Sequence, residues 1–127
     1  MTNVFLEHAN ITVSDPKGKA AKLCDLFGWK IRWEGEGKSN GYTVHVGGDH
    51  SYLALWSPQK LKEGGDKSER IQGHLNHVGV VVEDLDATEK RILDAGYTTY
   101  FHDDYEPGKR FYFDFNDDME IEVVCYS

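Results

Sequence analysis

The sequence predicts an α+β protein built from two βαβββ modules that together form a cupped mixed sheet. The main observation is an internal repeat: a histidine, an alternating apolar strand, and an aspartate that can begin a helix. The first copy spans Glu7–Pro16 and the second spans Asn76–Leu85, just over half a chain length later. The same order of helix and strands is predicted after each copy. A module of this length buries little core by itself, so the two are expected to pack together as one domain over residues 1–127.

In the first module, of about residues 4–57, a strand is predicted from Phe5 to Val13 because apolar and polar side chains alternate there. Asp15 followed by Pro16 is typical of a helix start, and Gly28 is typical of a helix end. The helix between them has an apolar face spaced at i, i+3, i+4 and i+7. This face comprises Ala20, Leu23, Cys24 and Phe27. Three further strands with polar turns between them are predicted at residues 29–33, 42–46 and 52–56.

A polar segment at residues 58–72 predicts the linker between the modules. The second module, of about residues 73–127, repeats the order of the first. After a strand that ends at Val82, Asp84 is predicted to begin a helix and Gly96 to end it. The inward face of this helix is predicted to comprise Leu85, Thr88, Ile92 and Ala95. Three strands follow, at about residues 97–101, 110–115 and 119–126, with a polar loop at 103–108.

Composition excludes several classes of partner. The formal net charge of −8 argues against nucleic acid and against an anionic membrane surface, both of which attract basic proteins. No basic and then apolar leader follows Met1, and the longest apolar run is too short to span a bilayer. The two cysteines do not form a disulfide framework. These observations predict a cytoplasmic protein that binds neither nucleic acid nor membranes.

Strand alternation sorts the polar side chains by sheet face. His8 points away from Ala9, Ile11 and Val13, and His77 likewise points away from the apolar stripe that follows it. On the last strand, Glu120 and Glu122 both point away from the apolar stripe, so alternation alone does not choose between them. Two imidazoles and one carboxylate on the face opposite the helices predict a divalent metal site with positions open for water or substrate.

Several segments together resemble the vicinal oxygen chelate superfamily, which includes glyoxalase I, the bleomycin and fosfomycin resistance proteins and the extradiol dioxygenases. The matching segments are the strand opened by His8, the helix that ends at Leu26-Phe27-Gly28-Trp29, the His77-Val78-Gly79-Val80 strand, and the closing run from Phe111 to Val124. The resemblance covers essentially the whole chain. It is specific for the superfamily and not for one activity, because the same scaffold carries several chemistries.

The resemblance implies that His8, His77 and Glu122 are metal ligands and that the ion is Mn²⁺, Fe²⁺, Ni²⁺ or Zn²⁺. The implied activity is that of a small metal-dependent lyase, thiol transferase or dioxygenase, in which the metal chelates two neighbouring oxygens of a small-molecule substrate. A homodimer is expected. The sequence departs from glyoxalase I, whose fourth ligand comes from the strand equivalent to Tyr52–Trp56. Here the equivalent residue is Ala54 or Leu53, depending on the register, and neither can bind a metal.

Three further side chains are candidates for contact with the substrate. Arg110 and Tyr112 point away from the apolar phenylalanine stripe of their strand, and Tyr112 and Glu122 are the candidate catalytic groups. A packing role is the alternative for Tyr112. His45 faces the site if Tyr42, Val44 and Val46 face the helix, and it is otherwise a surface histidine. The rival function is a metal-free drug- or metabolite-binding protein of the bleomycin-resistance type.

Overall fold

The structure, a computed structural model of the whole chain, describes residues 6–36, 41–58, 75–105, 108–116 and 119–126. The chain divides into two compact units, Met1–Glu63 and Gly64–Ser127. Apart from Pro58, the predicted linker at 58–72 lies outside the described residues. Neither described helix is long and apolar enough to cross a membrane.

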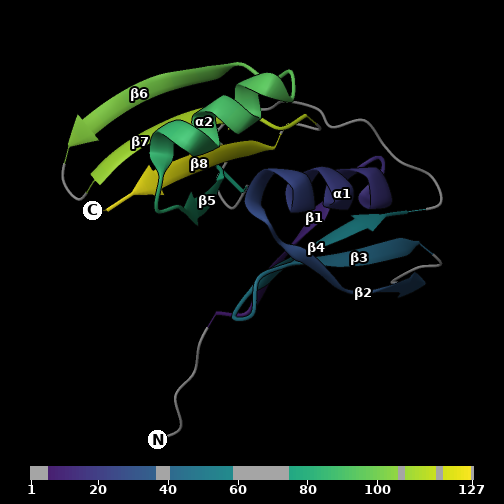
Figure 1. Cartoon of the computed structure of the whole chain (residues 1–127). Helices are drawn as coiled ribbons and strands as arrows, with labels where there is room; N and C mark the ends of the chain where they lie inside the picture. The colour runs from purple at the N-terminus through teal and green to yellow at the C-terminus, as the bar shows by residue number, and fades with distance from the viewer. Residues whose placement is uncertain (1–5, 37–40, 59–74, 106–107, 117–118, 127) are drawn as a thin grey trace, which may run out of the picture. The chain divides into compact units, whose positions relative to one another are not determined.

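The first unit is a four-stranded mixed sheet with one helix on one of its faces (Figure 1). Its elements are β1 (His8–Thr12), α1 (Pro16–Phe27), β2 (Lys30–Glu36), β3 (Tyr42–Gly47) and β4 (Tyr52–Ser57). The strand order is β1-β4-β3-β2, in which β1 and β4 are parallel and the other neighbours antiparallel. The Asp15 side chain accepts a hydrogen bond from Gly18 N, and Gly28 ends the helix with a φ of +70°. The predicted start and end of this helix are confirmed.

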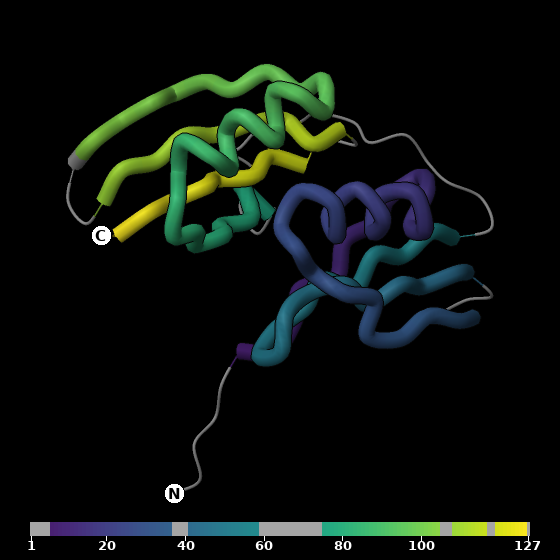
Figure 2. Tube along the Cα trace, viewed as in Figure 1, coloured from purple at the N-terminus to yellow at the C-terminus, as the bar shows by residue number. Residues whose placement is uncertain are grey.

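The second unit repeats the architecture of the first, as the chain trace shows (Figure 2). Its elements are β5 (Val78–Val81), α2 (Leu85–Asp94), β6 (Thr99–Tyr105), β7 (Gly108–Asp114) and β8 (Glu120–Cys125). The strand order is β5-β8-β7-β6, again with the first pair parallel and the others antiparallel. Asp84 begins α2 by accepting a hydrogen bond from Ala87 N. The predicted α+β class and the two βαβββ modules are therefore confirmed.

Each unit has its own apolar core between its helix and one face of its sheet. In the first unit, buried side chains of α1 meet alternate residues of β3 and β4, and this core includes Leu23, Val44, Val46 and Leu55. In the second unit the core residues share the predicted phenylalanine stripe, and they include Ile92, Phe111, Phe113, Phe115 and Ile121. Ala95 is exposed, contrary to the prediction, because α2 ends at Asp94. We call the opposite face of each sheet, away from the unit's own helix, the distal face.

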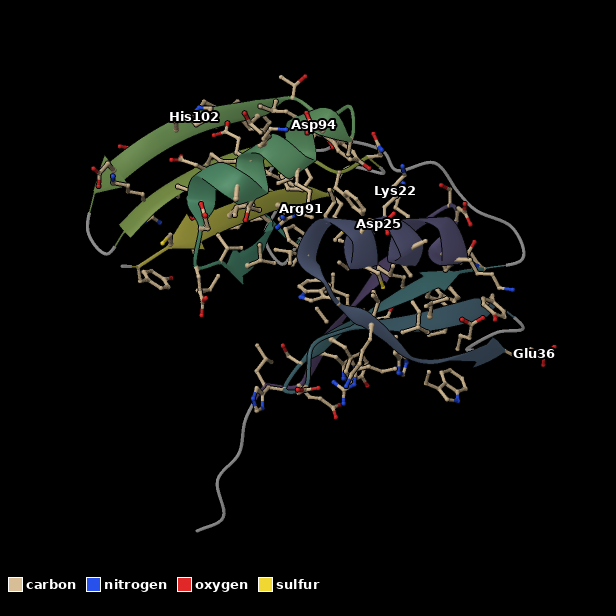
Figure 3. The ribbon with its side chains drawn as sticks, viewed as in Figure 1. Lys22, Asp25, Glu36, Arg91, Asp94 and His102 are labelled. Carbon is tan, nitrogen blue, oxygen red and sulfur yellow. The ribbon has the colours of Figure 1, made fainter. Side chains whose placement is uncertain are left out.

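Two strands are longer than the sequence predicts. β2 continues to Glu36, whose side chain is labelled in Figure 3, and β6 continues to Tyr105, where polar loops were expected. Both are edge strands. Charged residues are common in edge strands because they discourage another chain from pairing with the open edge. Each of these strands also has an irregular register, between Ile31 and Trp33 in β2 and between Tyr100 and Asp103 in β6. These bulges break the alternation on which strand prediction depends.

His102 of β6, labelled in Figure 3, belongs to a structural contact and not to the candidate site. Its Nε2 atom bonds the Glu89 carboxylate of α2, and the same carboxylate accepts a hydrogen bond from the Thr99 hydroxyl. His102 also packs against the buried Phe111 ring, with 5.8 Å between ring centroids. The contact therefore fastens α2 to the edge strand.

This contact predicts a pH-dependent stability. Burial raises the pKa of Glu89, but the hydrogen bonds from Thr99 and His102 outweigh it, so the pKa lies below the ordinary value of 4.5. A carboxyl with a lowered folded-state pKa stabilises the fold above its unfolded pKa and loses this contribution as the pH falls through the folded value. Glu89→Gln is expected to reduce the free energy of unfolding by about 1 kcal/mol at neutral pH. In urea titrations, the difference between variant and wild type should shrink below pH 4.5; a constant difference would contradict this account.

Candidate functional site

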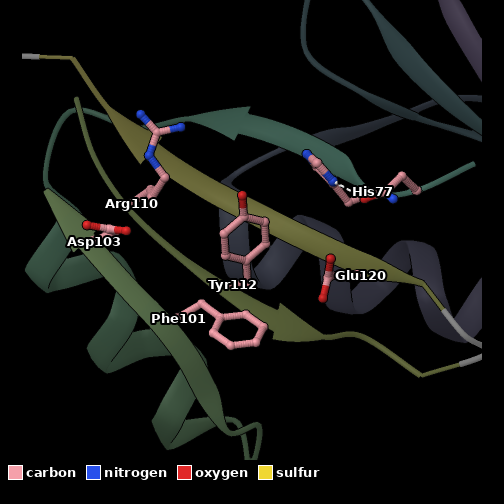
Figure 4. A pocket seen from close by; sticks show the side chains of 7 residues that line it. His77, Phe101, Asp103, Arg110, Tyr112 and Glu120 are labelled. Carbon is pink, nitrogen blue, oxygen red and sulfur yellow. Dashed lines mark hydrogen bonds between the residues drawn. The ribbon is translucent and has the colours of Figure 1, made fainter. Parts of the chain in front are cut away.

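The distal face of the second unit contains a cavity of about 320 Å³. Figure 4 shows its labelled lining side chains gathered on this face of the sheet. The lining residues are Asn76, His77, Phe101, Asp103, Arg110, Tyr112 and Glu120. The volume lies within the range of about 300–1,000 Å³ that small-molecule sites occupy. Three of the predicted site residues, His77, Arg110 and Tyr112, therefore line one cavity.

A chain of polar contacts crosses this face from β5 to β7. The Nε2 atom of His77 lies 3.1 Å from Oε1 of Glu122, and the Arg110 guanidinium donates to Oε2 of the same carboxylate at 2.9 Å. Arg110 also donates to the carbonyl oxygen of Gly108. The Glu122 and Arg110 side chains are only 13% and 10% exposed, so the low local dielectric strengthens this ion pair. The structure brings His77, Arg110 and Glu122 into direct contact.

Both ring nitrogens of His77 have a polar neighbour. Nδ1 lies 2.7 Å from the side-chain amide of Asn76, and Nε2 lies 3.1 Å from the Glu122 carboxylate. The tautomer with its proton on Nδ1 would leave Nε2 as an electron-pair donor for a metal ion. A ligating histidine whose other ring nitrogen donates to an oxygen is the usual arrangement at metal centres.

His8 in the first unit has the same local arrangement. Its Nδ1 atom lies 3.0 Å from Oε1 of Glu7, the preceding residue, as Asn76 precedes His77. This hydrogen bond lowers the pKa of Glu7. The imidazole also stacks on Tyr52, with 4.9 Å between centroids and 14° between planes. The His8 ring is therefore fixed by two neighbours, and its Nε2 atom is directed away from the bond to Glu7.

His45 lies on the distal face of the first unit and not at an isolated surface position. Its ring stacks on Tyr52 at 4.5 Å and lies 5.2 Å from Trp33, so rings from three strands form a row. Burial, followed by the charges of His8 and Arg32, lowers the pKa of His45. The structure places His45 on the same face as His8, whereas His77 and Glu122 belong to the other unit.

The strand registers settle which residue of β4 corresponds to Glu122. In the second unit Gly79, two residues after His77, pairs with Glu122. In the first unit Asn10, two residues after His8, pairs with Ala54. Ala54 is thus the counterpart of Glu122, and its methyl side chain provides no ligand. Glu120, the alternative to Glu122, accepts a hydrogen bond from the Tyr100 hydroxyl at 2.7 Å.

His77 and Glu122 supply donor atoms of the kinds that divalent metal ions bind, an imidazole nitrogen and a carboxylate oxygen. The two atoms lie 3.1 Å apart, which is also an ordinary hydrogen-bond distance. Among the described residues, no group of three His, Cys, Asp or Glu side chains is assembled for a metal, and the predicted third ligand, His8, belongs to the first unit.

Comparison with known proteins identifies the family. The sequence pattern of the Glyoxalase/Bleomycin resistance protein/Dioxygenase superfamily matches residues 7–113. The chain belongs to this superfamily. No curated protein sequence matches the chain.

Solved structures of the superfamily share this fold at low sequence identity. A glyoxylase/bleomycin resistance protein/dioxygenase domain from Frankia sp. EAN1pec has a TM-score of 0.80 and 19% identity, and the match covers 99% of this chain and 100% of that one. A variant of the FosX fosfomycin resistance protein from Listeria monocytogenes, in complex with Mn(II) and 1S,2S-dihydroxypropylphosphonic acid, has a TM-score of 0.71 and 18% identity. That match covers 97% of this chain and 93% of the other. A glyoxalase family protein from Enterococcus faecalis has a TM-score of 0.74 and 17% identity, covering 94% and 96% of the two chains.

Sequence reasoning missed several residues of the site. Asn76 holds the His77 ring, yet an asparagine before a strand is an ordinary loop residue. Phe101 was predicted within a strand but not in the site, and it lines the cavity because of the bulge in β6. Asp103 also lines the cavity, in a segment that the sequence predicted at the cavity rim, although it lies in the extended strand β6 and not in a loop. The available signal for Asn76 was its position directly before the repeated histidine, which Glu7 shares. Nothing in the sequence distinguishes the bulge.

Proposed function

We propose that this member of the superfamily is a divalent-metal-dependent enzyme of the lyase, thiol transferase or dioxygenase type. It acts on a small substrate that offers two neighbouring oxygens. The observation that supports the proposal most strongly is the position of His77 Nε2, 3.1 Å from the Glu122 carboxylate, while Nδ1 bonds Asn76. The Mn(II) complex of the FosX relative supports a divalent ion within the superfamily.

In this proposal His8, His77 and Glu122 hold the ion, which is Mn²⁺, Fe²⁺, Ni²⁺ or Zn²⁺. When bound, such an ion acts as a Lewis acid and stabilises negative charge on substrate oxygens. Asn76 and Glu7 fix the two imidazoles through their Nδ1 atoms. Arg110 holds the second oxygen of Glu122, so that one oxygen of this carboxylate faces His77.

Tyr112 is the proposed catalytic group beside the metal ligands. Its ring meets the His77 ring edge-on with 5.5 Å between centroids, and it lines the cavity. In the sheet, Tyr112 pairs with Glu122, so both side chains emerge next to each other on the distal face. A phenol hydroxyl there can donate a proton to a substrate oxygen or accept one from it. Arg110 and His45 are the proposed substrate-binding residues.

We also propose that the protein works as a homodimer in the cytoplasm with a small-molecule substrate. Both cysteines are thiols, and Cys125 is buried, which agrees with a reducing compartment. The acidic net charge of −8 supports the absence of nucleic acid and anionic membrane partners.

Metal content tests the proposal. Wild type, His8→Ala and His77→Ala are loaded with Mn²⁺, Fe²⁺, Ni²⁺ or Zn²⁺, freed of excess ion, and measured by elemental analysis. The matched control is His50→Ala, which removes an exposed histidine next to the β3–β4 turn. About one ion per chain is expected in wild type and in the control, and much less in the other two variants. A wild type that retains none of the four ions, or a His77→Ala variant that retains as much as wild type, would refute the proposal.

A second candidate function is a metal-free binding protein of the bleomycin-resistance type. The observation that favours it is the Arg110–Glu122 ion pair, because a guanidinium already neutralises the only carboxylate of the ligand set. The alanine at position 54 favours it as well, since it leaves no fourth ligand. Under this alternative, small drugs or metabolites stabilise the metal-free protein against heat, and metal loading adds nothing.

A further inference from the structure

The β6 bulge adds one aromatic side chain to the cavity. Tyr100 pairs with Tyr112, and the next pair is Asp103 with Arg110. Over this stretch β6 therefore contains one residue more than β7. His102 turns to the helix side, where it meets Phe111. Phe101 has a φ of +53°, in the left-handed region that a bulky residue adopts only under constraint. The result is a phenylalanine turned to the distal face and 72% exposed.

Phe101 and its neighbours make an aromatic wall. The Phe101 ring lies edge-on to Tyr100, with 5.1 Å between centroids, and edge-on to Tyr112 at 6.3 Å. Figure 4 shows the Phe101 and Tyr112 rings on the same side of the cavity. In the ligand-free protein, both the positive φ of Phe101 and the exposure of its ring to water lower stability. A ligand with a flat apolar group that packs on the ring would offset these two costs. The alternative is that Phe101 only shields the Tyr100 and Tyr112 rings and contacts no ligand.

Among the charged side chains that line the cavity, negative groups outnumber positive ones. Among the residues that line the cavity, the permanently charged cation is Arg110, and its guanidinium is paired with Glu122. Asp103 and Glu120 are the lining carboxylates. Glu120 receives one neutral hydrogen bond, from Tyr100, which does not cancel its charge. In the metal-free cavity a ligand therefore meets two carboxylates, Asp103 and Glu120, that no cation among the described lining residues neutralises, and an anionic ligand is disfavoured by the same charges; a bound divalent ion would offset part of this effect.

We infer that the ligand of this cavity combines a flat aromatic body with a protonated amine, so that the ring packs on Phe101 and Tyr112 and the ammonium group faces Asp103 and Glu120. The inference rests on the proposed function in that it concerns the same site, and it assigns the part of the substrate that does not bind the metal. This preference for a cation would distinguish the chain from superfamily members that select an anionic substrate such as a phosphonate.

Three catechols of different charge test the inference, because all have the same pair of neighbouring oxygens. They are dopamine, which is cationic, 4-methylcatechol, which is neutral, and 3,4-dihydroxyphenylacetate, which is anionic. Binding to Mn²⁺-loaded protein is measured by calorimetry without oxygen, and the order dopamine, 4-methylcatechol, 3,4-dihydroxyphenylacetate is expected, with about threefold between successive members, because the ion offsets part of the negative charge of the site. Equal binding of the three, or a preference for the anion, overturns the inference while leaving the proposed chelation of oxygens intact.

A second pair of probes separates the two proposals. Phenethylamine and phenylacetate lack the chelating oxygens and are tested on metal-free protein. A preference of about tenfold for phenethylamine there supports the inference even if metal loading fails and the proposed enzyme is wrong. If none of the five probes binds in either state, the inference is refuted.

Matched variants locate the source of the preference. Asp103→Asn and Glu120→Gln are each expected to remove most of the difference between cationic and anionic probes. Asp104→Asn is the control, because Asp104 is the next residue of β6 and does not line the cavity. Phe101→Gly is expected to weaken all aromatic probes alike without destabilising the fold, since glycine adopts a positive φ readily. A charge preference that persists in the double variant Asp103→Asn/Glu120→Gln overturns the assignment.

Discussion

Replacing Glu122 by glutamine is expected to weaken Mn²⁺ binding by more than about 100-fold while leaving the chain folded. Changes outside the immediate ligands of a metal already weaken binding by about 10–100-fold, and this change removes a ligand charge itself. The chain should remain folded because glutamine has the same shape and still accepts a hydrogen bond from Arg110, although loss of the buried ion pair lowers its stability. Titration of free Mn²⁺ measured by electron paramagnetic resonance gives the affinity, and thermal unfolding gives the stability.

Glu120→Gln provides the matched control for this prediction. Glu120 lies two residues earlier on β8 and on the same face, but its contact is with Tyr100 and not with His77. Mn²⁺ affinity in this variant should remain within about threefold of wild type, as expected for a partly exposed charge beside the site. If Glu120→Gln loses the metal and Glu122→Gln retains it, the assignment of Glu122 as the ligand is wrong.

Replacing Arg110 by methionine is expected to lower the free energy of unfolding of the metal-free protein by about 3 kcal/mol. The Glu122 carboxylate is 13% exposed, and without the guanidinium it remains desolvated with only His77 as a partner. A bound divalent ion supplies the missing positive charge. Mn²⁺ should therefore raise the melting temperature of Arg110→Met more than that of wild type, which would show that Arg110 and the metal each supply positive charge to the same carboxylate.

Lys109→Met is the control, because Lys109 is an exposed cation at the preceding position of the same strand. It should change the stability by less than about 0.5 kcal/mol and leave the response to Mn²⁺ unchanged. Equal losses in the two variants would mean that the effect comes from net charge and not from the buried pair. Destabilisation of Arg110→Met with no response to any divalent ion would favour the metal-free binding protein.

Much of the fold follows from local chemistry that a sequence displays. Asp15 and Asp84 begin both helices by accepting a backbone hydrogen bond, and Gly28 ends the first at a positive φ. The stripe of Phe111, Phe113 and Phe115 is fully buried, as strict alternation predicts. The same alternation placed Arg110, Tyr112 and Glu122 on one face, where the structure has them within one network. The superfamily assignment is confirmed as well.

The parts of the fold and site that could not be predicted depend on contacts between strands, which composition and alternation do not encode. Alternation does not separate Glu120 from Glu122, which differ in their side-chain contacts, with Tyr100 and with His77. The choice between Leu53 and Ala54 required the β1–β4 and β5–β8 registers. The bulges in β2 and β6 occur at non-glycine residues, so no turn signal marks them. The metal-ligand role of His8, His77 and Glu122 stays a prediction, because two of these residues belong to one unit and the third to the other.

The register of β6 has a consequence for how this cavity can change during evolution. If residue 101 were deleted, Tyr100, His102 and Asp103 would face Tyr112, Phe111 and Arg110 in regular succession, with every other side chain on the face that it now occupies. Gain or loss of this single codon would thus add or remove one wall of the cavity without disturbing the core. A change of length at this position would therefore alter the ligand preference of the cavity as directly as a substitution would.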